Sequence, residues 1–196
     1  MANDHFKNEK NSKFTLVGGI LSPVADAYGK SSLISAEHRI EMCRLACEEH
    51  PLITVEPWEA LRSQWTPTLE VLQHFKDELH KYFPSIRVML LAGSDLVEGF
   101  KHEHIWNPQN LESLIKVFGI VAIERTSAIN LHSEIFNSNL LFSLRDNIEI
   151  IPQPVQSELS SSKLRLLIRR GYSVKYLTDD KVVKYIEDNN LYNFIC

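Results

Sequence analysis

Cysteine is scarce in this chain, which has three cysteines in 196 residues: Cys43, Cys47 and Cys196. Small extracellular proteins held together by disulfides carry far more, so this scarcity favours a reducing, intracellular location, cytoplasmic or nuclear. Cys43 and Cys47 lie four positions apart, on one helical face with Ala36 and Ile40. That spacing predicts two buried small side chains rather than metal ligands or a disulfide.

Long hydrophobic runs and an excess of positive charge are also absent. No apolar run approaches the roughly 20 residues that cross a bilayer, and residues 1–13 lack the apolar core of a signal peptide. The chain carries 21 lysines and arginines against 25 aspartates and glutamates, whereas a nucleic-acid-binding protein usually presents a basic face. We therefore expect neither a membrane nor a nucleic acid as a partner. Small anionic ligands remain open, because they need only a local cluster of cations.

Several familiar catalytic signatures are missing from the sequence. It has no Walker-type glycine-rich loop and no Ser/His/Asp or Cys/His triad pattern. The run Lys-His-Glu-His at residues 101–104 has metal-binding side chains but no further ligands at a suitable spacing. The sequence therefore predicts no metal site built from protein ligands.

What the sequence does contain is an alternation of strand and helix patterns. Strands are predicted at residues 14–20, 53–56, 87–92, 119–124 and 147–151, several of them apolar runs typical of parallel strands buried on both faces. Helices are predicted at residues 36–49, 59–82, 108–117, 133–144, 160–169 and 179–189. This alternation predicts an α/β fold with a doubly wound parallel sheet. The length of the chain, without repeat or linker, predicts a single domain over residues 1–196.

A serine-rich segment opens the predicted helix at residues 160–169. Three serines stand where the helix would begin, and Lys163 and Arg165 follow the last of them, Ser162. A helix N-terminus presents unpaired N–H groups and a partial positive charge, so it favours an anion. Ser162, Lys163 and Arg165 are therefore candidates for binding the phosphates of a nucleotide. The alternative is an ordinary serine N-cap followed by solvated cations.

Further candidates lie in loops that follow predicted strands, because ligands of open α/β sheets bind beyond the carboxyl ends of the strands. The loop after the first predicted strand carries an aromatic ring and an ammonium group, Tyr28 and Lys30. After the third, Gly93 allows a ligand to approach the backbone and Asp95 can accept hydrogen bonds from ribose hydroxyls. Alternatively, Lys30 is only solvated and Asp95 only caps a short helix.

Two tryptophans offer flat surfaces on which a ring can stack. They are Trp65 and Trp106, and Ile105 directly precedes the second. The alternative for either tryptophan is a place in the hydrophobic core.

Motifs along nearly the whole chain carry a family resemblance. In chain order they are residues 18–28 (GGILSPVADAY), 35–39 (SAEHR), 58–59 (WE), 65–69 (WTPTL), 91–96 (LAGSDL), Trp106, 160–165 (SSSKLR), 171–177 (GYSVKYL) and 190–192 (NLY). Together they resemble the eukaryotic nicotinamide/nicotinic acid mononucleotide adenylyltransferases. The resemblance implies a Rossmann-like sheet of the nucleotidyltransferase type. It also implies transfer of an adenylyl group from ATP, with Mg²⁺, to nicotinamide mononucleotide or nicotinic acid mononucleotide, which gives NAD or deamido-NAD and pyrophosphate.

The resemblance also gives the candidate residues roles. It implies that Lys30 and Arg165 are catalytic and neutralise phosphate charge beside Ser162 and Lys163. The other implied binding residues line the nucleotide and pyridine pockets: Tyr28 at the phosphates, Trp65, Thr68, Ile105 and Trp106 at the pyridine ring, and Gly93 and Asp95 at the adenosine ribose.

The chain departs from this family in three places, one of which is Ser157, where relatives usually carry an asparagine before the serine-rich motif. Members begin with a buried strand, a Gly-Ser-Phe-Asn-Pro-type turn and a histidine, whereas residues 2–6 here resemble the end of the helix that follows that signature. We therefore expect a sheet whose first central strand is missing and in which two strands each have an open edge. Pro67 stands where relatives carry a helix former, so a helix is predicted to restart with Thr66 as its cap and Pro67 as its first residue.

Two other functions stay open at this point. One is a catalytically impaired family member that acts as a ligand-binding or chaperone-like partner. A homo-oligomer is compatible both with this role and with adenylyl transfer. The other is a nucleotidyltransferase for a sugar phosphate or choline phosphate. Trp65 and Trp106 argue against the latter, because such substrates have no flat ring to stack.

Overall fold

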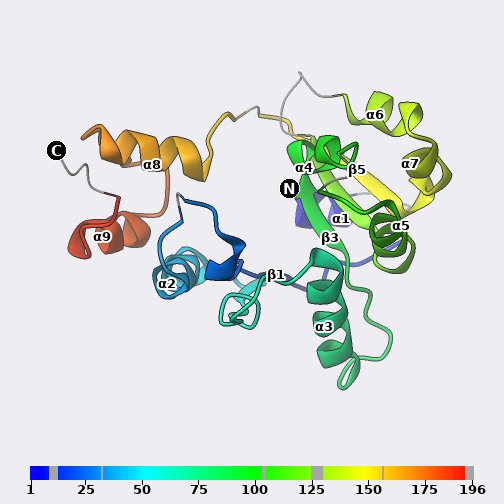
Figure 1. Cartoon of the computed structure of the whole chain (residues 1–196), viewed down its shortest axis with the longest axis horizontal. Helices are drawn as coiled ribbons and strands as arrows, with labels where there is room; N and C mark the ends of the chain where they lie inside the picture. Colours follow the sequence, from blue (N-terminus) through cyan, green and yellow to red (C-terminus); the bar gives the residue numbers. More distant parts are fainter. Residues whose placement is uncertain (9–12, 32, 103–104, 125–129, 156, 193–196) are drawn as a thin grey trace. The chain divides into compact units, whose positions relative to one another are not determined.

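The computed structural model describes residues 1–8, 13–31, 33–102, 105–124, 130–155 and 157–192 (Figure 1). The chain forms two compact units. Unit 1 comprises Met1–Leu16 and Pro67–Glu158, and unit 2 comprises Val17–Thr66 and Leu159–Cys196. The single domain over residues 1–196 stays a prediction.

Unit 1 is built on a parallel three-stranded sheet in the order β3-β4-β5. The strands are β3 (Leu90–Gly93), β4 (Ile120–Glu124) and β5 (Ile148–Pro152). The central strand β4 has four consecutive buried residues. Its uninterrupted apolar sequence suits this position, because a central parallel strand is covered on both faces.

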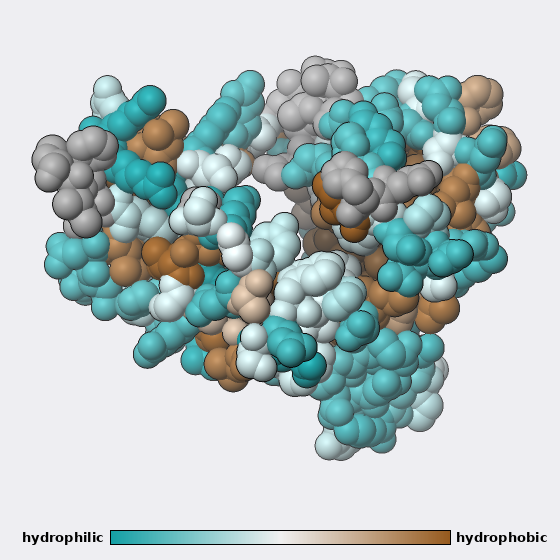
Figure 2. Space-filling model, viewed as in Figure 1, coloured by the Kyte–Doolittle hydropathy of each residue, from teal (hydrophilic) through white to brown (hydrophobic). Residues whose placement is uncertain are grey.

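Helices cover one face of this sheet. They are α3 (Thr68–His80), α4 (Ser94–Gly99), α5 (Pro108–Val117), α6 (Leu131–Asn137) and α7 (Asn139–Ser143). Their apolar side chains join Ala92 and Ala122 of the sheet in one hydrophobic core, where Ile115 is 0% exposed. The surface over α3, at the lower right of Figure 2, is hydrophilic, as expected for a helix with one buried side.

The helix α1 (Ala2–Asn8) contacts the other face of the sheet in unit 1. Its His5 Nε2 lies 2.8 Å from Oε1 of Glu149, which is in register with Val121 and so points away from the face that carries Ala122. The Arg87 guanidinium lies 5.0 Å from the ring centroid of Phe14, in a cation–π contact that ties the segment after α1 to the same unit. A helix at this place agrees with the expectation for residues 2–6.

Unit 2 combines a short parallel sheet with three helices. The strands β1 (Gly19–Leu21) and β2 (Ile53–Val55) pair in parallel. The helices are α2 (Ala36–Cys47), α8 (Ser161–Arg169) and α9 (Asp180–Asp188). One cluster joins Ala36 and Ile40 of α2 with Ala60, and a second joins Val182 and Ile186 of α9 with partly buried side chains of α2 and α8.

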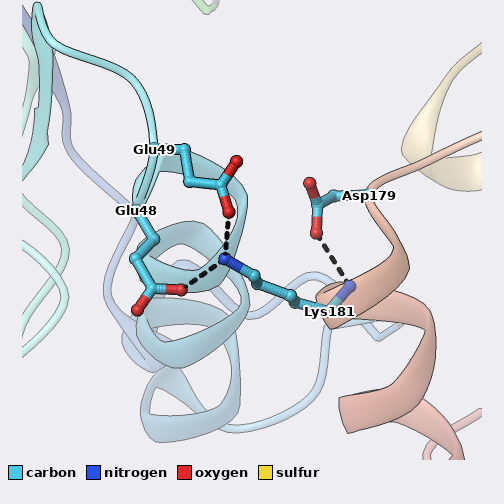
Figure 3. A network of polar contacts seen from close by, with 4 residues as sticks. All are labelled: Glu48, Glu49, Asp179 and Lys181. Carbon is cyan, nitrogen blue, oxygen red and sulfur yellow. Dashed lines mark hydrogen bonds and ion pairs between the residues drawn. The ribbon is translucent and has the colours of Figure 1, made fainter.

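A polar network also joins α9 to the end of α2 (Figure 3). Lys181 Nζ donates to Glu48 Oε2 at 2.8 Å and to Glu49 Oε1 at 2.6 Å. Asp179 caps α9 by accepting a hydrogen bond from the Lys181 backbone N–H at 2.8 Å. The two hydrogen bonds to carboxylates raise the pKa of the Lys181 ammonium.

The predicted α/β fold with parallel strands is confirmed. In the part of the chain that the structure describes, β1 pairs only with β2, and β3 only with β4. Each of these strands therefore has one edge without a ladder partner among the described residues, and the missing central strand stays a prediction. None of the described helices has the length and apolar character needed to cross a membrane.

Several details of the sequence prediction are wrong, among them the strand predicted at residues 87–92, which begins only at Leu90. The first predicted strand, residues 14–20, is reduced to β1 at Gly19–Leu21. The helix predicted over residues 59–82 is found only as α3. The helix predicted over residues 133–144 is divided into α6 and α7, because Ser138 has an extended backbone and its Oγ caps α7. The two thiols predicted to be buried, those of Cys43 and Cys47, are free and only partly buried.

Candidate active site

The serine-rich segment forms the start of α8. Ser160 is the N-cap, and its Oγ accepts a hydrogen bond from the Lys163 backbone N–H at 3.2 Å. Ser162 and Lys163 are exposed in the first turn. One turn further, Arg165 Nη2 donates to Ser162 Oγ at 3.1 Å. A hydroxyl group, a guanidinium group and a helix N-terminus therefore meet at one place, and each of these can bind a phosphate.

Tyr28 and Lys30 lie on the loop between β1 and α2. Tyr28 ends a single 3-10 turn, Asp26–Tyr28. Gly29 follows with a φ of 71°, a left-handed conformation that glycine adopts without strain. The Tyr28 side chain is 51% exposed and Lys30 is exposed as well, so both can reach a ligand.

Side chains that the sequence did not identify as functional anchor this loop. Ser22 Oγ donates to Glu59 Oε2 at 2.6 Å, and burial raises the pKa of the Glu59 carboxyl. Arg39 donates to Asp26 Oδ1 at 2.7 Å, and this hydrogen bond lowers the pKa of Asp26. Glu59 and Arg39 stand inside motifs that carry the family resemblance, but their loop partners are set only by the folded backbone.

Trp65 and Thr68 lie on either side of the point where α3 begins. Trp65 is 51% exposed, and Thr68 is the first helical residue and partly buried. Among the described residues no helix lies between β2 and this point, so the helix begins rather than restarts here, one residue later than predicted, and Pro67 occupies the N-cap position expected for Thr66. The Pro67 carbonyl accepts the first hydrogen bonds of the helix, at 2.9 and 3.1 Å.

The remaining candidates lie in unit 1, at and beyond the carboxyl end of β3. Gly93 ends β3, and Asp95 is exposed in the first turn of the directly following α4. The Trp106 ring meets the buried Phe100 ring edge to face, with centroids 4.8 Å apart and planes at 76°. Trp106 is therefore partly packed on the core, as one alternative held, while Ile105 is 62% exposed.

The two units share these candidates. Unit 2 contains Tyr28, Lys30, Trp65, Ser162, Lys163 and Arg165, and unit 1 contains Thr68, Gly93, Asp95, Ile105 and Trp106. Within unit 2, Arg165 and Ser162 are in direct contact. Their common role in one ligand site stays a prediction.

The described residues include no group of three histidine, cysteine, aspartate or glutamate side chains that could hold a metal ion. Glu103 and His104, from the run at residues 101–104, lie outside the described residues.

Comparisons with known proteins give consistent results. Residues 2–167 match the family model described as cytidylyltransferase-like. The nicotinamide/nicotinic acid mononucleotide adenylyltransferase of Arabidopsis thaliana is 42% identical over 191 residues, which cover 95% of this chain and 80% of that protein. The equivalent protein of Oryza sativa subsp. japonica is 39% identical and 73% covered. Nicotinamide/nicotinic acid mononucleotide adenylyltransferase 2 of Saccharomyces cerevisiae is 38% identical, and the chain spans 49% of its length.

Proposed function

Because the chain belongs to the nicotinamide/nicotinic acid mononucleotide adenylyltransferase family, we propose that it transfers the adenylyl group of ATP to nicotinamide mononucleotide or nicotinic acid mononucleotide. The products are NAD or deamido-NAD and pyrophosphate. The observation that carries this proposal is the identity of 42% over 95% of the chain to a protein of that name. The contact of Arg165 with Ser162 at the start of α8 supports it.

The proposed reaction brings two anions together. A phosphate oxygen of the mononucleotide attacks the α-phosphorus of ATP, a new P–O bond forms, and the bond to the leaving pyrophosphate breaks. The chain contributes positioning and charge neutralisation, without a covalent intermediate on the protein. Lys30, Ser162, Lys163 and Arg165 act on the phosphates, with Arg165 able to donate two parallel hydrogen bonds, and Tyr28 shapes the same pocket.

In the proposed site aromatic rings bind the pyridine base, and a carboxylate binds the adenosine ribose. Trp65 and Trp106 flank the pyridine ring, with Thr68 and Ile105 beside it, since aromatic rings favour offset or edge contacts with other flat rings. Gly93 and Asp95 meet the adenosine ribose, where the Asp95 carboxylate accepts hydrogen bonds from hydroxyls.

Magnesium enters this scheme with the substrate, as MgATP. Mg²⁺ is usually held by substrate phosphates, waters and at most one or two carboxylates, so it needs no dedicated cluster of protein ligands. This fits a site rich in cations such as Lys30 and Arg165, which contact phosphate oxygens that the ion leaves free.

We also propose a reducing intracellular compartment, cytoplasmic or nuclear, which the small number of cysteines supports. The proposed ligands are ATP, the two mononucleotides and NAD. Neither nucleic acid nor membrane is proposed as a partner, and a homo-oligomer is compatible with this activity.

The test measures NAD formation from MgATP and nicotinamide mononucleotide in a coupled dehydrogenase assay. A charge-assisted hydrogen bond is worth about 1.5–3 kcal/mol, or about 10- to 150-fold in rate if it acts in the transition state. Lys30→Ala and Arg165→Ala should each lower turnover at least about tenfold. The matched control is Lys184→Ala, which removes a 74% exposed lysine of α9 and should leave turnover unchanged.

Two outcomes would contradict the proposal. Turnover by both variants at the level of the unmodified chain would mean that the two cations are ordinary solvated side chains. Binding of nicotinamide mononucleotide without release of pyrophosphate would identify a ligand-binding protein instead of an enzyme.

A further inference from the structure

Arg39, at the start of α2, is the most heavily bonded side chain near the loop that carries Tyr28 and Lys30. Its side chain is 10% exposed. Nε donates to the Ile34 carbonyl at 3.0 Å, Nη1 to the Val24 carbonyl at 2.6 Å and Nη2 to Asp26 Oδ1 at 2.7 Å. All three nitrogens of the guanidinium group are therefore engaged by the loop itself.

The acceptors of these hydrogen bonds lie on both sides of the exposed part of the loop. Val24 and Asp26 precede Lys30 in the chain, and Ile34 follows it. One side chain thus holds both ends of the segment from which Tyr28 and Lys30 project. The Ala36 backbone N–H, in the first turn of α2, also lowers the pKa of the Asp26 carboxyl.

Among its described residues the loop has little regular structure. Between β1 and α2 its regular structure is a single 3-10 turn, which Gly29 closes, and the residues from Asp26 to Lys30 are exposed. Ordering such a backbone costs conformational entropy. A planar guanidinium group can meet three acceptors in a fixed geometry, whereas a lysine ammonium group at the end of a flexible chain cannot reproduce it.

We propose that Arg39 is a positioning residue for adenylyl transfer, which fixes the loop so that Lys30 meets the substrate phosphates. This rests on the proposed function. Arg39 acts through the loop rather than on the substrate, because its guanidinium nitrogens face the carbonyl groups and carboxylate beneath it. Misplacement of a reacting group by about 1 Å can cost up to about a hundredfold in rate, so loss of the loop geometry should appear in turnover.

The test is a double-mutant cycle between Arg39 and Lys30 in the full chain, with NAD formation as the readout. Arg39→Lys should lower turnover at least about tenfold. In the Lys30→Ala background the same change should cost less than about twofold, because residues that act through one another are not additive. The matched control is Arg44→Lys on the same helix, where the arginine is 56% exposed and lies 3.8 Å from Glu41; it should leave turnover unchanged.

Hydrogen exchange provides a readout without substrate. Peptides that span residues 24–34 should exchange faster in Arg39→Lys than in the unmodified chain, while peptides from α9 keep their rates. Equal losses of turnover in both backgrounds, or unchanged exchange in residues 24–34, would overturn the positioning role. Absence of NAD formation by the unmodified chain would overturn the proposed function instead, and hydrogen exchange would still decide whether Arg39 fixes the loop.

Discussion

Replacement of Gly119 by alanine should destabilise unit 1. Gly119 connects α5 to β4 with a φ of 80°, and its carbonyl accepts a hydrogen bond from the Leu90 N–H at 3.1 Å. A Cβ at this position would lie 2.8 Å from Arg87 Nη2 and 2.9 Å from the Asn147 carbonyl oxygen. The arginine can move, but the carbonyl belongs to the backbone that leads into β5.

The magnitude has two parts. A left-handed conformation costs an alanine about 1–2 kcal/mol, and crowding in a packed region costs about 1–3 kcal/mol more. Gly171→Ala separates them, because Gly171 follows α8 with a φ of 74° but has nothing within 4 Å of the place where the new methyl group would lie. We expect Gly171→Ala to lower the free energy of unfolding by the first amount alone, and Gly119→Ala by the sum, about 2–5 kcal/mol.

The assay is thermal and urea unfolding of the full chain, followed by circular dichroism. For a chain of this size 1 kcal/mol shifts Tm by about 2–4 °C, so the two variants should differ by about 2–12 °C. Equal losses in the two variants would refute the reasoning, because they would show that the close approach to the Asn147 carbonyl carries no energetic cost.

Three further predictions concern binding, capping and pH. Trp65→Ala and Trp106→Ala should each weaken binding of nicotinamide mononucleotide severalfold in a fluorescence titration, since an aromatic contact is worth about 0.5–1.5 kcal/mol; unchanged affinity in both would contradict the pyridine pocket. Asn107→Ala should lower the free energy of unfolding by about 1 kcal/mol in urea, because Asn107 Oδ1 caps α5 through two backbone N–H groups, and Asn107→Asp should restore it. The Arg39 hydrogen bond lowers the pKa of Asp26, so its stabilisation is complete above the unfolded pKa of about 3.9 and is lost as the pH falls through the folded value. Asp26→Asn should therefore be less stable than the unmodified chain at pH 7, and the difference should shrink as the pH falls below the unfolded pKa; a constant difference would contradict this.

The best sequence predictions are those with strong local signals. The helix at residues 108–117 is found at those bounds, because Asn107 caps it and Pro108 occupies its first position. The helix at residues 160–169 is found with Ser160 as its cap. The predicted strands at residues 119–124 and 147–151 agree to within a residue with β4 and β5, since their apolar runs match strands covered on both faces.

The wrong predictions concern positions where tertiary contacts decide the structure. The apolar pattern at residues 133–144 suits one helix, but the extended Ser138 divides it. Residues 14–17 have strand-forming side chains, yet the ladder with β2 begins only at Gly19. The hydrogen bonds of Arg39 could not be predicted from the sequence either, because nothing near a helical arginine indicates that it donates to carbonyl groups 5 and 15 residues earlier.

The network around Lys181 also has a consequence for chemical reactivity. Acylating reagents and enzymes attack the neutral amine of lysine, and each unit by which a pKa rises lowers the neutral fraction about tenfold. Glu48 and Glu49 raise the pKa of Lys181, so at neutral pH its amine is almost always protonated and engaged by two carboxylates. We therefore expect this lysine to react more slowly with acylating reagents than an exposed lysine without carboxylate partners, although its side chain is 42% exposed.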